Sequence, residues 1–529
     1  MMSLLPPVFT RKFTYLHLIT ILVAATSAGC YEGADESVGA LSARESARPV
    51  SLKPGDRIRP YEKNPYYLAW GDQPIFALGA TMHHSWTPIS RPGTVDIEAQ
   101  LDRLGRVIEA INSPHVWGFV RVLPYDPMNH LHDGDVERVL QPWVRLEDRP
   151  RFNLRHFEPE WEERLRTYLE MALARRIIVS LEIWDDWSIT RGLNGEYDPG
   201  REAAWNANPF NPLNNINYGQ RVLPKETAEC EAPFYNAIPT RDNNVRVLKL
   251  QKLYVDRLLE IAKDYPNVML KVSNESRAHL DWSRFWANYV RERTPGMMIG
   301  EMPATNRRNG GGACEDDFSP LTLSMDPHYD YVDVSQGVTR YEFGSPRAQA
   351  LGGAKRIAFY RQVMARAGTQ KPVIVSKDYT RDANGGDIVL WGRFIGGAAA
   401  ARFHRPGVEH GDDVVDFQHE AIGRLGRFIA EVPFWRMHPA PDLIKDLPRQ
   451  AQANVLAEPE GHTVIQLLDA RAGDRLAVRL TQGTWVARWI DPARGEEIKR
   501  RDVDVTGRVL RLHVPANLDH LILHLYPKT

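Results

Sequence analysis

The sequence predicts an α/β protein in which a (β/α)8 barrel is followed by a small C-terminal β-sandwich. Between about residues 64 and 430, short apolar runs alternate with longer amphipathic runs, which is the pattern of repeated β-α units. After the segment "VPFWRMHPAPDLI", residues 432–444, the pattern changes to short strands of alternating hydrophobicity separated by turns. The chain of 529 residues is long enough to hold both domains.

The expected barrel strands are short runs rich in β-branched residues, as is typical of strands buried on both faces. They are Ile75–Ala80, Phe119–Leu123, Ile177–Ile183, Val268–Val272, Met297–Gly300, Tyr331–Ser335, Val373–Ser376 and Gly397–Ala401. Segments such as "TVDIEAQLDRLGRVIEAI" and "RAQALGGAKRIAFYRQVMARA" lie between them and predict helices. Eight strands with helical crossovers favour a closed barrel over an open sheet. No Gly-rich phosphate loop follows any of these strands.

The C-terminal strands follow the segment "VPFWRMHPAPDLI" and are separated by turns such as Ala472-Gly473-Asp474. They are the runs "TVIQLLDA", "RLAVRLTQ", "TWVARWIDP", "EIKRRDVDV", "RVLRLHVP" and "HLILHLYPK". We therefore divide the chain into residues 1–30, 31–60, 61–435 and 436–529. These parts are interpreted as a signal peptide, a flexible tether, the barrel and the β-sandwich.

The N-terminus has the layout of a secretory signal. Arg11 and Lys12 precede an apolar run that ends in small residues at Cys30. The stretch "SAGC" resembles a bacterial lipobox, in which Cys30 is lipidated, and ordinary cleavage near Ala28 is the alternative. We expect an exported protein: a periplasmic, outer-membrane or cell-surface lipoprotein, or otherwise a secreted one.

The overall composition limits the partners. A formal net charge of −1 gives no support for nucleic-acid binding, which calls for a basic stripe. We expect a monomer that meets a membrane only through an N-terminal lipid anchor. The 14 Trp and 19 Tyr fit a sugar-binding surface and a large core equally well.

Two long loops leave the C-terminal ends of expected strands, where barrel enzymes build their sites. Residues 185–242 follow the third strand and residues 301–330 follow the fifth. Cys230 lies in the first loop and Cys314 in the second, so a disulfide would tie the loops together. Two free buried thiols are the alternative.

The stretch "NVMLKVSNESRAH" places Asn274 and Glu275 at the end of the fourth expected strand. A carboxyl group in a partly dry barrel mouth can act as a general acid, and the neighbouring amide can bind a sugar hydroxyl. A helix N-cap is the structural alternative, because Ser or Asn before a helix is common.

The stretch "PVIVSKDYT" places Lys377 and Asp378 at the end of the seventh expected strand. These charges can form a solvated strand end, an ion pair of Asp378 with Lys377 or Arg381, or part of a catalytic site. Glu301 ends the fifth strand in the stretch "MMIGEMPAT" and is a further carboxylate at the same face of the barrel.

The chain resembles clan A retaining glycoside hydrolases, in which Asn-Glu ends the fourth strand and a second carboxylate ends the seventh. More narrowly it is similar to the apiosidase-like, family 5-like barrels with a C-terminal domain often described as collagen-binding. The stretches that carry this likeness are "NPYYLAWGDQPIFALGATMHHSW", "WGRFIGGAAAARFHRP", "VPFWRMHPAPDLI" and "WVARWIDPARGE". The resemblance implies a glycosidase for plant or microbial polysaccharides without a metal or organic cofactor.

On this resemblance Glu275 is the acid/base, and a nucleophilic Glu is expected where this sequence has Lys377. Asp378 then serves as nucleophile if the strand end is shifted, or as the base of an inverting enzyme, and Glu301 is the other candidate. Retaining pairs lie roughly 5–5.5 Å apart and inverting pairs about 6.5–9.5 Å apart.

Further polar and aromatic residues at expected strand ends are candidates for binding sugar hydroxyls, with Trp184 or Trp187 stacking on a ring. The set is Asn274, His83, His84, Arg121, Trp184, Asp185, Trp187, Gln336, Glu301, Lys377 and His404. Barrel mouths also hold purely structural polar networks. No ligand spacing supports a metal at His83, His84 and His404, so we expect none.

Two functional hypotheses remain. The first is a glycoside hydrolase that uses Glu275 and Asp378, and the second is a non-catalytic carbohydrate-binding lipoprotein on a degenerate barrel. Lys377 in the expected nucleophile position favours the second. A peptidase or collagen-binding function would rest on the C-terminal domain alone, and the sequence shows no nucleophile-base pair for it.

Overall fold

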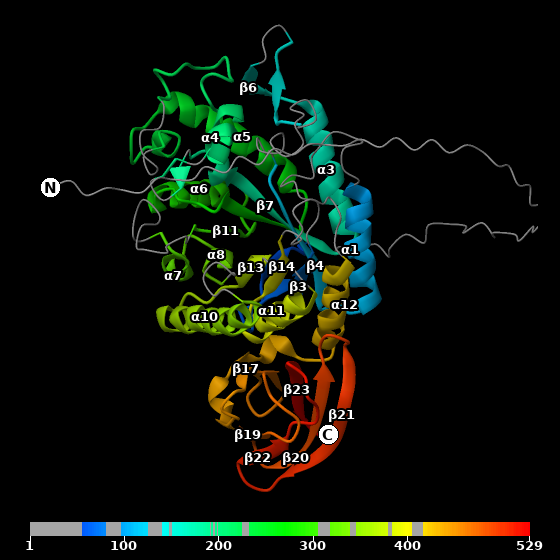
Figure 1. Ribbon diagram of the computed structural model, residues 1–529. Coiled ribbons are helices and arrows are strands. Elements are labelled where there is room, and N and C mark those ends of the chain that lie inside the picture. The colour runs from blue at the N-terminus through cyan, green and yellow to red at the C-terminus, as the bar shows by residue number, and fades with distance from the viewer. Residues whose placement is uncertain are drawn as a thin grey trace, which may run out of the picture. The chain divides into compact units, whose positions relative to one another are not determined.

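Eight parallel strands close into a barrel in this computed structural model (Figure 1). The structure describes residues 55–80, 97–124, 140–147, 151–190, 192–193, 196–197, 199–224, 232–304, 318–338, 345–378, 383–404 and 416–528. The barrel strands are β3 (Gln73–Gly79), β4 (Val116–Val122), β7 (Ile177–Asp185), β10 (Val268–Asn274), β11 (Ile299–Glu301), β12 (Tyr331–Asp333), β13 (Val373–Asp378) and β14 (Ala400–Phe403). The first strand pairs in parallel with both the second and the last, which closes the barrel. The predicted fold class is confirmed, because all eight expected strands are present in order.

Helices follow most barrel strands and cover the outside of the barrel (Figure 1). They are α1 (Ile97–Ile111), α3 (Pro159–Ala174), α4 (Pro199–Ala207), α5 (Val245–Ala262), α6 (Leu280–Arg293), α7 (Pro320–Met325), α8 (Ser335–Val338), α10 (Pro346–Ala367), α11 (Ala383–Ile395) and α12 (Asp416–Ala430). No helix in the described ranges is both long and apolar enough to cross a membrane.

Local sequence signals set the ends of α10. The Ser345 side chain accepts a hydrogen bond from the backbone N–H of Ala348, and Pro346 takes the first helical position, where a missing N–H costs nothing. Gly368 ends the helix with φ at +70°, a left-handed conformation that only glycine adopts without a steric cost. Asn244 caps α5 in the same way as Ser345 caps α10.

The barrel interior is apolar near the N-terminal ends of the strands. A hairpin of β1 (Ile58–Pro60) and β2 (Leu68–Trp70) precedes β3, and its Trp70 ring lies 4.6 Å from the ring of Trp117 on β4. Gly300 on β11 lies against Tyr331 on β12, and a Cβ at this glycine would stand 2.4 Å from the tyrosine ring. Close packing therefore fills this end of the barrel, and the polar groups gather at the other end.

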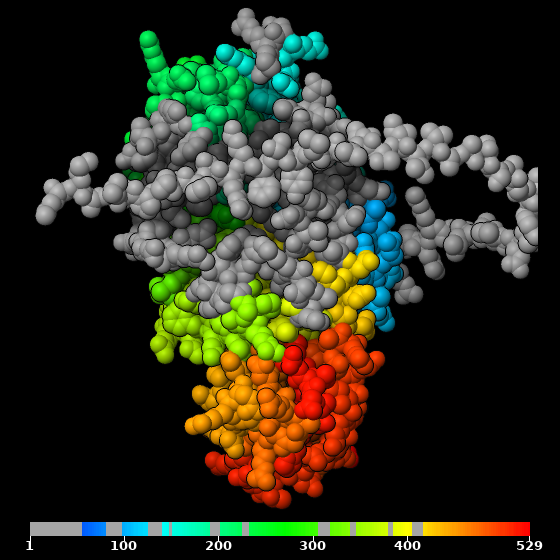
Figure 2. Space-filling model, viewed as in Figure 1, coloured from blue at the N-terminus to red at the C-terminus, as the bar shows by residue number. Residues whose placement is uncertain are grey.

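Two antiparallel sheets form the C-terminal β-sandwich, and in the space-filling view its orange-to-red strands make one contiguous region (Figure 2). One sheet contains β15 (His438–Pro439), β17 (Gln452–Ala457), β18 (Thr463–Leu468), β20 (Gly483–Asp491), β21 (Glu496–Val505) and β23 (His520–Pro527), and the other contains β16 (Ile444–Asp446), β19 (Arg475–Arg479) and β22 (Val509–His513). The six expected runs are all strands, and β15, β16 and β17 add to them. Trp485 and Trp489 lie in the core between the sheets.

Candidate functional site

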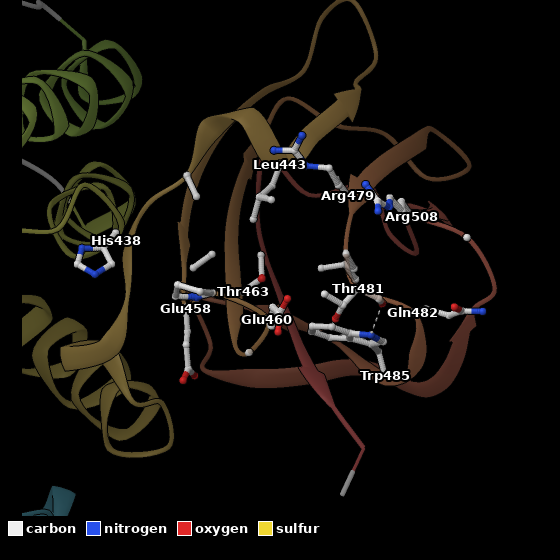
Figure 3. A pocket seen from close by; sticks show the side chains of 16 residues that line it. His438, Leu443, Glu458, Glu460, Thr463, Arg479, Thr481, Gln482, Trp485 and Arg508 are labelled. Carbon is white, nitrogen blue, oxygen red and sulfur yellow. Dashed lines mark hydrogen bonds between the residues drawn. The ribbon is translucent and has the colours of Figure 1, made fainter.

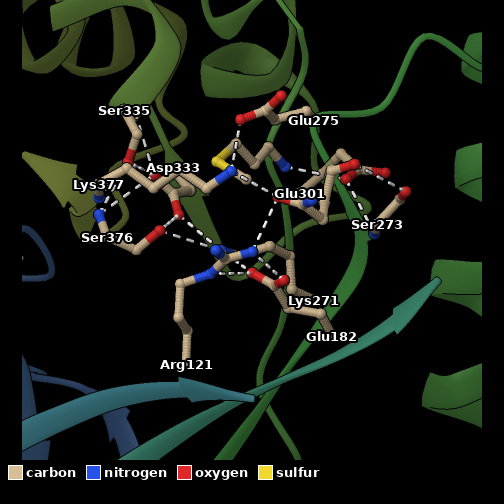
Figure 4. A network of polar contacts seen from close by, with 12 residues as sticks. Arg121, Glu182, Lys271, Ser273, Glu275, Glu301, Asp333, Ser335, Ser376 and Lys377 are labelled. Atoms are coloured by element: carbon tan, nitrogen blue, oxygen red, sulfur yellow. Dashed lines mark hydrogen bonds and ion pairs between the residues drawn. The ribbon is translucent and has the colours of Figure 1, made fainter. Parts of the chain in front are cut away.

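A network of buried charges spans the barrel interior just below the C-terminal ends of the strands (Figure 4). Lys271 on β10 lies at its centre. Its Nζ is 2.8 Å from Glu182 Oε1 on β7, 2.6 Å from Asp333 Oδ2 on β12 and 3.2 Å from Ser376 Oγ on β13. Because β10 and β13 are not neighbours in the sheet, these contacts cross the interior.

Arg121 on β4 closes the same network from the opposite side. Its Nε and Nη2 both donate to the carboxylate of Glu182, and Nη2 also donates to Asn274 Oδ1 at 2.8 Å. Burial raises the pKa of Glu182, but Arg121 and Lys271 outweigh it and bring that pKa to about 2. Glu182 is therefore a fixed anion that positions cations, and it is unsuited to carry a catalytic proton.

Glu275 stands above this network, directly after β10. Its Oε1 accepts hydrogen bonds from Gln336 Nε2 at 2.6 Å and from Lys377 Nζ at 2.5 Å, and its side chain retains 13% exposure. The backbone of Glu275 has φ at +48°, a left-handed conformation that is costly for a residue with a side chain. Strained residues of this kind concentrate at functional sites, so Glu275 stays the leading candidate for one.

A β-bulge on β13 decides which of Lys377 and Asp378 faces Glu275. Val375 pairs with Ala401 and Asp378 with Phe403, so three steps along β13 match two along β14. The extra residue lets both Ser376 and Lys377 face inward: Ser376 Oγ donates to Asp333, and Lys377 Nζ donates to Asn274 Oδ1 at 2.6 Å.

Asp378 consequently points out of the barrel, toward α11. Its Oδ1 accepts a hydrogen bond from Arg393 Nε at 2.8 Å, and neither side chain of this pair is exposed. The expectation that Asp378 serves as nucleophile or base opposite Glu275 is corrected here, because the bulge reverses the side of the strand on which it lies. Asp378 does form an ion pair, but its partner among the described residues is Arg393 and not Lys377, and Arg381 lies outside those residues.

Glu301, the other candidate for a second carboxylate, also faces away from Glu275. Its carboxylate accepts hydrogen bonds from the backbone N–H groups of Ser273 and Met302 and from Ser283 Oγ on α6. Complete burial raises the pKa of Glu301 to about 8, against the opposing effect of these hydrogen bonds. The position between β10, β11 and α6 makes Glu301 a support for the strand end that carries Glu275.

The two tryptophans that were expected to stack on a sugar ring lie in different environments. Trp184 is fully buried against rings of α5 and α6, with Tyr254 at 5.1 Å and Trp286 at 5.4 Å between centroids. It is a core residue, and the expectation that it stacks on a sugar is wrong for this reason. Trp187 is half-buried in the turn after β7 and remains a candidate for stacking.

Other sequence-predicted residues converge on the mouth. Asp185 Oδ1 accepts a hydrogen bond from Asn274 Nδ2 at 2.7 Å, and His404 lies near Arg402 at the end of β14. His83, His84, Cys30, Cys230 and Cys314 lie outside the described residues. In the described part of the chain, no group of three or more His, Cys, Asp or Glu side chains is arranged to hold a metal ion.

Sequence reasoning missed Glu182, Lys271, Asp333 and Ser376. For Glu182, Lys271 and Asp333 the available signal was a charged residue inside an otherwise apolar strand, as in "VSLEIWD", "VMLKVSN" and "YVDVS", whereas the uncharged Ser376 gave no such signal. A charged side chain on a strand whose two faces are both buried needs a partner, so its presence in the sequence indicates an interior polar network.

A separate cavity of about 780 Å³ lies at one end of the β-sandwich (Figure 3). Its apolar lining residues include Leu480 and Trp485, and the Trp485 Nε1–H donates to the carbonyl of Thr481 at 3.0 Å. Glu458, Glu460 and other polar side chains surround it. None of the residues predicted from the sequence to form the site belongs to this cavity.

Comparison with solved structures identifies proteins that share this architecture. A protein described as a glycoside hydrolase matches with a TM-score of 0.56 and 12% identity, covering 89% of this chain and 97% of that one. A glycoside hydrolase family 5 protein from Bacteroides vulgatus matches with the same TM-score and identity, covering 89% of this chain and 93% of that one. The chain has the fold of clan A glycoside hydrolases. No family model and no curated protein matches the sequence.

The fold places residues at the ends of the barrel strands but assigns no activity, because one barrel fold supports many functions. What this barrel presents is a carboxylate at the end of its fourth strand, Glu275, in contact with the ammonium group at the end of its seventh, Lys377. Burial lowers the pKa of Lys377 to about 7, and the positive charge of Arg121 adds to this effect against the attraction of Glu275.

Proposed function

We propose that this protein binds a carbohydrate at the mouth of its barrel and that Lys377 takes the place of the second carboxylate of a retaining glycosidase. The observation that carries the proposal is the contact of 2.5 Å between Lys377 Nζ and Glu275 Oε1. A two-carboxylate mechanism needs carboxyl groups separated by roughly 5–5.5 Å or about 6.5–9.5 Å, with the scissile bond between them. An ion pair in direct contact leaves no such gap.

The groups at the mouth suit hydrogen bonding to sugar hydroxyls. Glu275 and Asp185 offer carboxylate acceptors, Asn274 and Gln336 offer amides that both donate and accept, and Lys377 donates. These side chains are fixed by mutual hydrogen bonds, so they are preorganised for a ligand and lose little conformational entropy on binding. The family 5-like fold supports a carbohydrate as ligand by analogy.

Hydrolysis is the second candidate, and the backbone of Glu275 favours it. A left-handed glutamate beside Asn274 at the fourth strand end is costly to maintain unless the orientation of its carboxyl group matters. In this alternative Glu275 is the proton-transferring residue, and the protein is a glycoside hydrolase whose other catalytic carboxylate comes from outside the described residues.

The experiment that separates these functions measures binding and hydrolysis on the same glycans. Immobilised plant and bacterial polysaccharides are tested for retention of the wild type, and released reducing sugar is measured in parallel. Retention that is lost in Glu275→Gln, without sugar release, supports the binding function. Sugar release by the wild type that disappears in Glu275→Gln supports the hydrolase, and absence of both retention and release contradicts the proposal.

Export is part of the same proposal. The N-terminal pattern supports a lipoprotein whose mature chain begins at Cys30. Mass spectrometry of the protein isolated from membranes should find a lipidated N-terminal Cys30. The Cys30→Ala variant should instead be found in the soluble fraction. An unmodified mature chain that begins at another residue would contradict lipidation and leave ordinary secretion.

A further inference from the structure

Among the described residues, Arg402 at the end of β14 is a buried cation that no carboxylate contacts. The residue is 4% exposed, and no acidic group lies within ion-pair distance of it in the described ranges. Its hydrogen bonds run through Nη1, to the carbonyl of Ser376 at 3.0 Å and to His404 Nδ1 at 3.5 Å. Nε is buried and has no hydrogen-bond partner there.

Four other buried cations, three inside the barrel and one on α11, have carboxylate partners. Arg121, Lys271, Lys377 and Arg393 each contact a carboxylate at 2.8 Å or less. An isolated buried charge is costly, and proteins retain one chiefly where it binds something. Arg402 is therefore the exception among these charges. Arg361 and Lys371, which are also buried and contact no carboxylate in the described ranges, donate to backbone carbonyls and leave no buried nitrogen without a hydrogen bond, whereas Arg402 does.

The acidic groups near Arg402 are already in use. Glu182 is bound by both Arg121 and Lys271, and Asp333 is bound by Lys271, Ser335 and Ser376. Burial and, to a smaller extent, the nearby charge of Arg121 lower the pKa of Arg402 to about 9, against the attraction of Glu182. The guanidinium stays protonated at neutral pH and keeps unused donor capacity.

We propose that Arg402 binds the anionic group of an acidic sugar, either a uronate carboxylate or a sulfate ester, within the carbohydrate site at the barrel mouth. This inference rests on the proposed carbohydrate binding and adds the class of ligand. A guanidinium fits such groups because its planar donors match two oxygens of a carboxylate or sulfate. His404, which contacts Nη1, directly follows the same strand.

A structural role for Arg402 is the competing explanation. Its Nη1 donates to the Ser376 carbonyl, which directly precedes Lys377 in the bulge of β13. If the arginine served only to hold that carbonyl, removing it would destabilise the fold. If it serves a ligand, Arg402→Gln relieves an unpaired charge, and the melting temperature of the free protein stays unchanged or rises.

The test compares matched acidic and neutral ligands by calorimetry on the full-length protein. Oligogalacturonides, oligoglucuronates and oligomannuronates are each paired with the carboxyl-reduced neutral oligosaccharide, and a sulfated galactan oligosaccharide is paired with its desulfated form. The wild type should bind the acidic member of one pair about tenfold or more tightly, as expected for a charge-assisted hydrogen bond. Preference within a uronate pair or within the sulfate pair identifies the anion.

The variants decide whether Arg402 causes this preference. Arg402→Gln should abolish the preference and leave binding of the neutral partner within about twofold, whereas Arg402→Lys should keep part of it. Arg511→Gln, an exposed arginine of β22, is the control that should change neither binding nor melting. Arg393→Gln is the control for a paired buried arginine and should lower the melting temperature.

Three outcomes overturn the inference. They are equal binding of acidic and neutral ligands, binding of neutral ligands alone, and a preference that survives Arg402→Gln, which together with a lower melting temperature of that variant would assign Arg402 the structural role. Binding of neutral glycans alone would leave the proposed function standing without this inference. A wild type that binds no glycan would contradict both.

Discussion

Lys377 on β13 reaches across the barrel to Glu275 after β10, with Nζ 2.5 Å from Oε1. The same ammonium group donates to Asn274, so one lysine engages both residues of the Asn-Glu pair. A site arranged in this way presents a neutralised ion pair where a retaining glycosidase needs two separated carboxyls. The charge at position 377 is therefore the feature on which binding and hydrolysis diverge.

Lys377→Glu should convert a binding site into a site with hydrolytic activity. Two carboxyl groups that face each other repel, which favours protonation of one and moves them apart. The positive charges of Arg121 and Arg402 nearby would help to accommodate the new carboxylate. Release of nitrophenol from a panel of nitrophenyl glycosides should rise above the wild-type level by at least about tenfold.

The control for this gain is Lys377→Met, which removes the ammonium group and adds no carboxylate. It should bind ligand more weakly and show no added hydrolysis. If Lys377→Glu folds with a wild-type circular dichroism spectrum and stays inactive on every glycoside that the wild type binds, the barrel mouth lacks the geometry of a retaining pair.

Stability of the wild type relative to Lys377→Met should rise with pH above neutrality. Burial lowers the pKa of Lys377 from 10.5 to about 7 in the folded protein. Between these values the unfolded chain binds more protons than the folded one, so the free energy of unfolding increases with pH. The slope is at most about 1.4 kcal/mol per pH unit and is absent from the methionine variant. Urea unfolding of both proteins from pH 6 to pH 9.5 measures it, and parallel curves would contradict the shift.

Glu301→Gln should show the opposite dependence. Burial raises the pKa of Glu301 from 4.5 to about 8 in the folded protein. Between these values the folded state binds more protons, so the free energy of unfolding falls as the pH rises toward 8. Glutamine does not titrate, and the melting temperature of the variant relative to the wild type should increase between pH 5 and pH 8.5. An unchanged difference would mean that Glu301 is already ionised at pH 5.

Asp378→Asn should destabilise the protein without acting directly on the ligand site. The substitution leaves the fully buried guanidinium of Arg393 without its anion, which typically costs about 3–5 kcal/mol. Asp502→Asn removes the exposed pair with Lys528 and should cost about 0.5 kcal/mol or less. Urea unfolding measures both. Unchanged stability together with lost glycan binding or hydrolysis would return Asp378 to the functional site.

The sequence by itself determined the architecture and one part of the site. Apolar runs of strand length, amphipathic runs between them and a change of period after the segment at residues 432–444 are local properties, and each predicted strand is present. Glu275 could be placed because it directly follows a strand whose end must reach the barrel mouth. Position along one strand is sufficient for such an inference.

Only the tertiary structure decided which neighbouring charges face the site. The bulge between Val375 and Asp378 turns Lys377 inward and Asp378 outward, and its partner Arg393 lies on the following helix. Glu301 and Trp184 likewise end on the helix side of their strands. A single extra residue reverses the side on which a side chain lies, and the network of Lys271 joins strands that are not adjacent. Pairings across a closed barrel depend on that closure, which no local pattern of residues records.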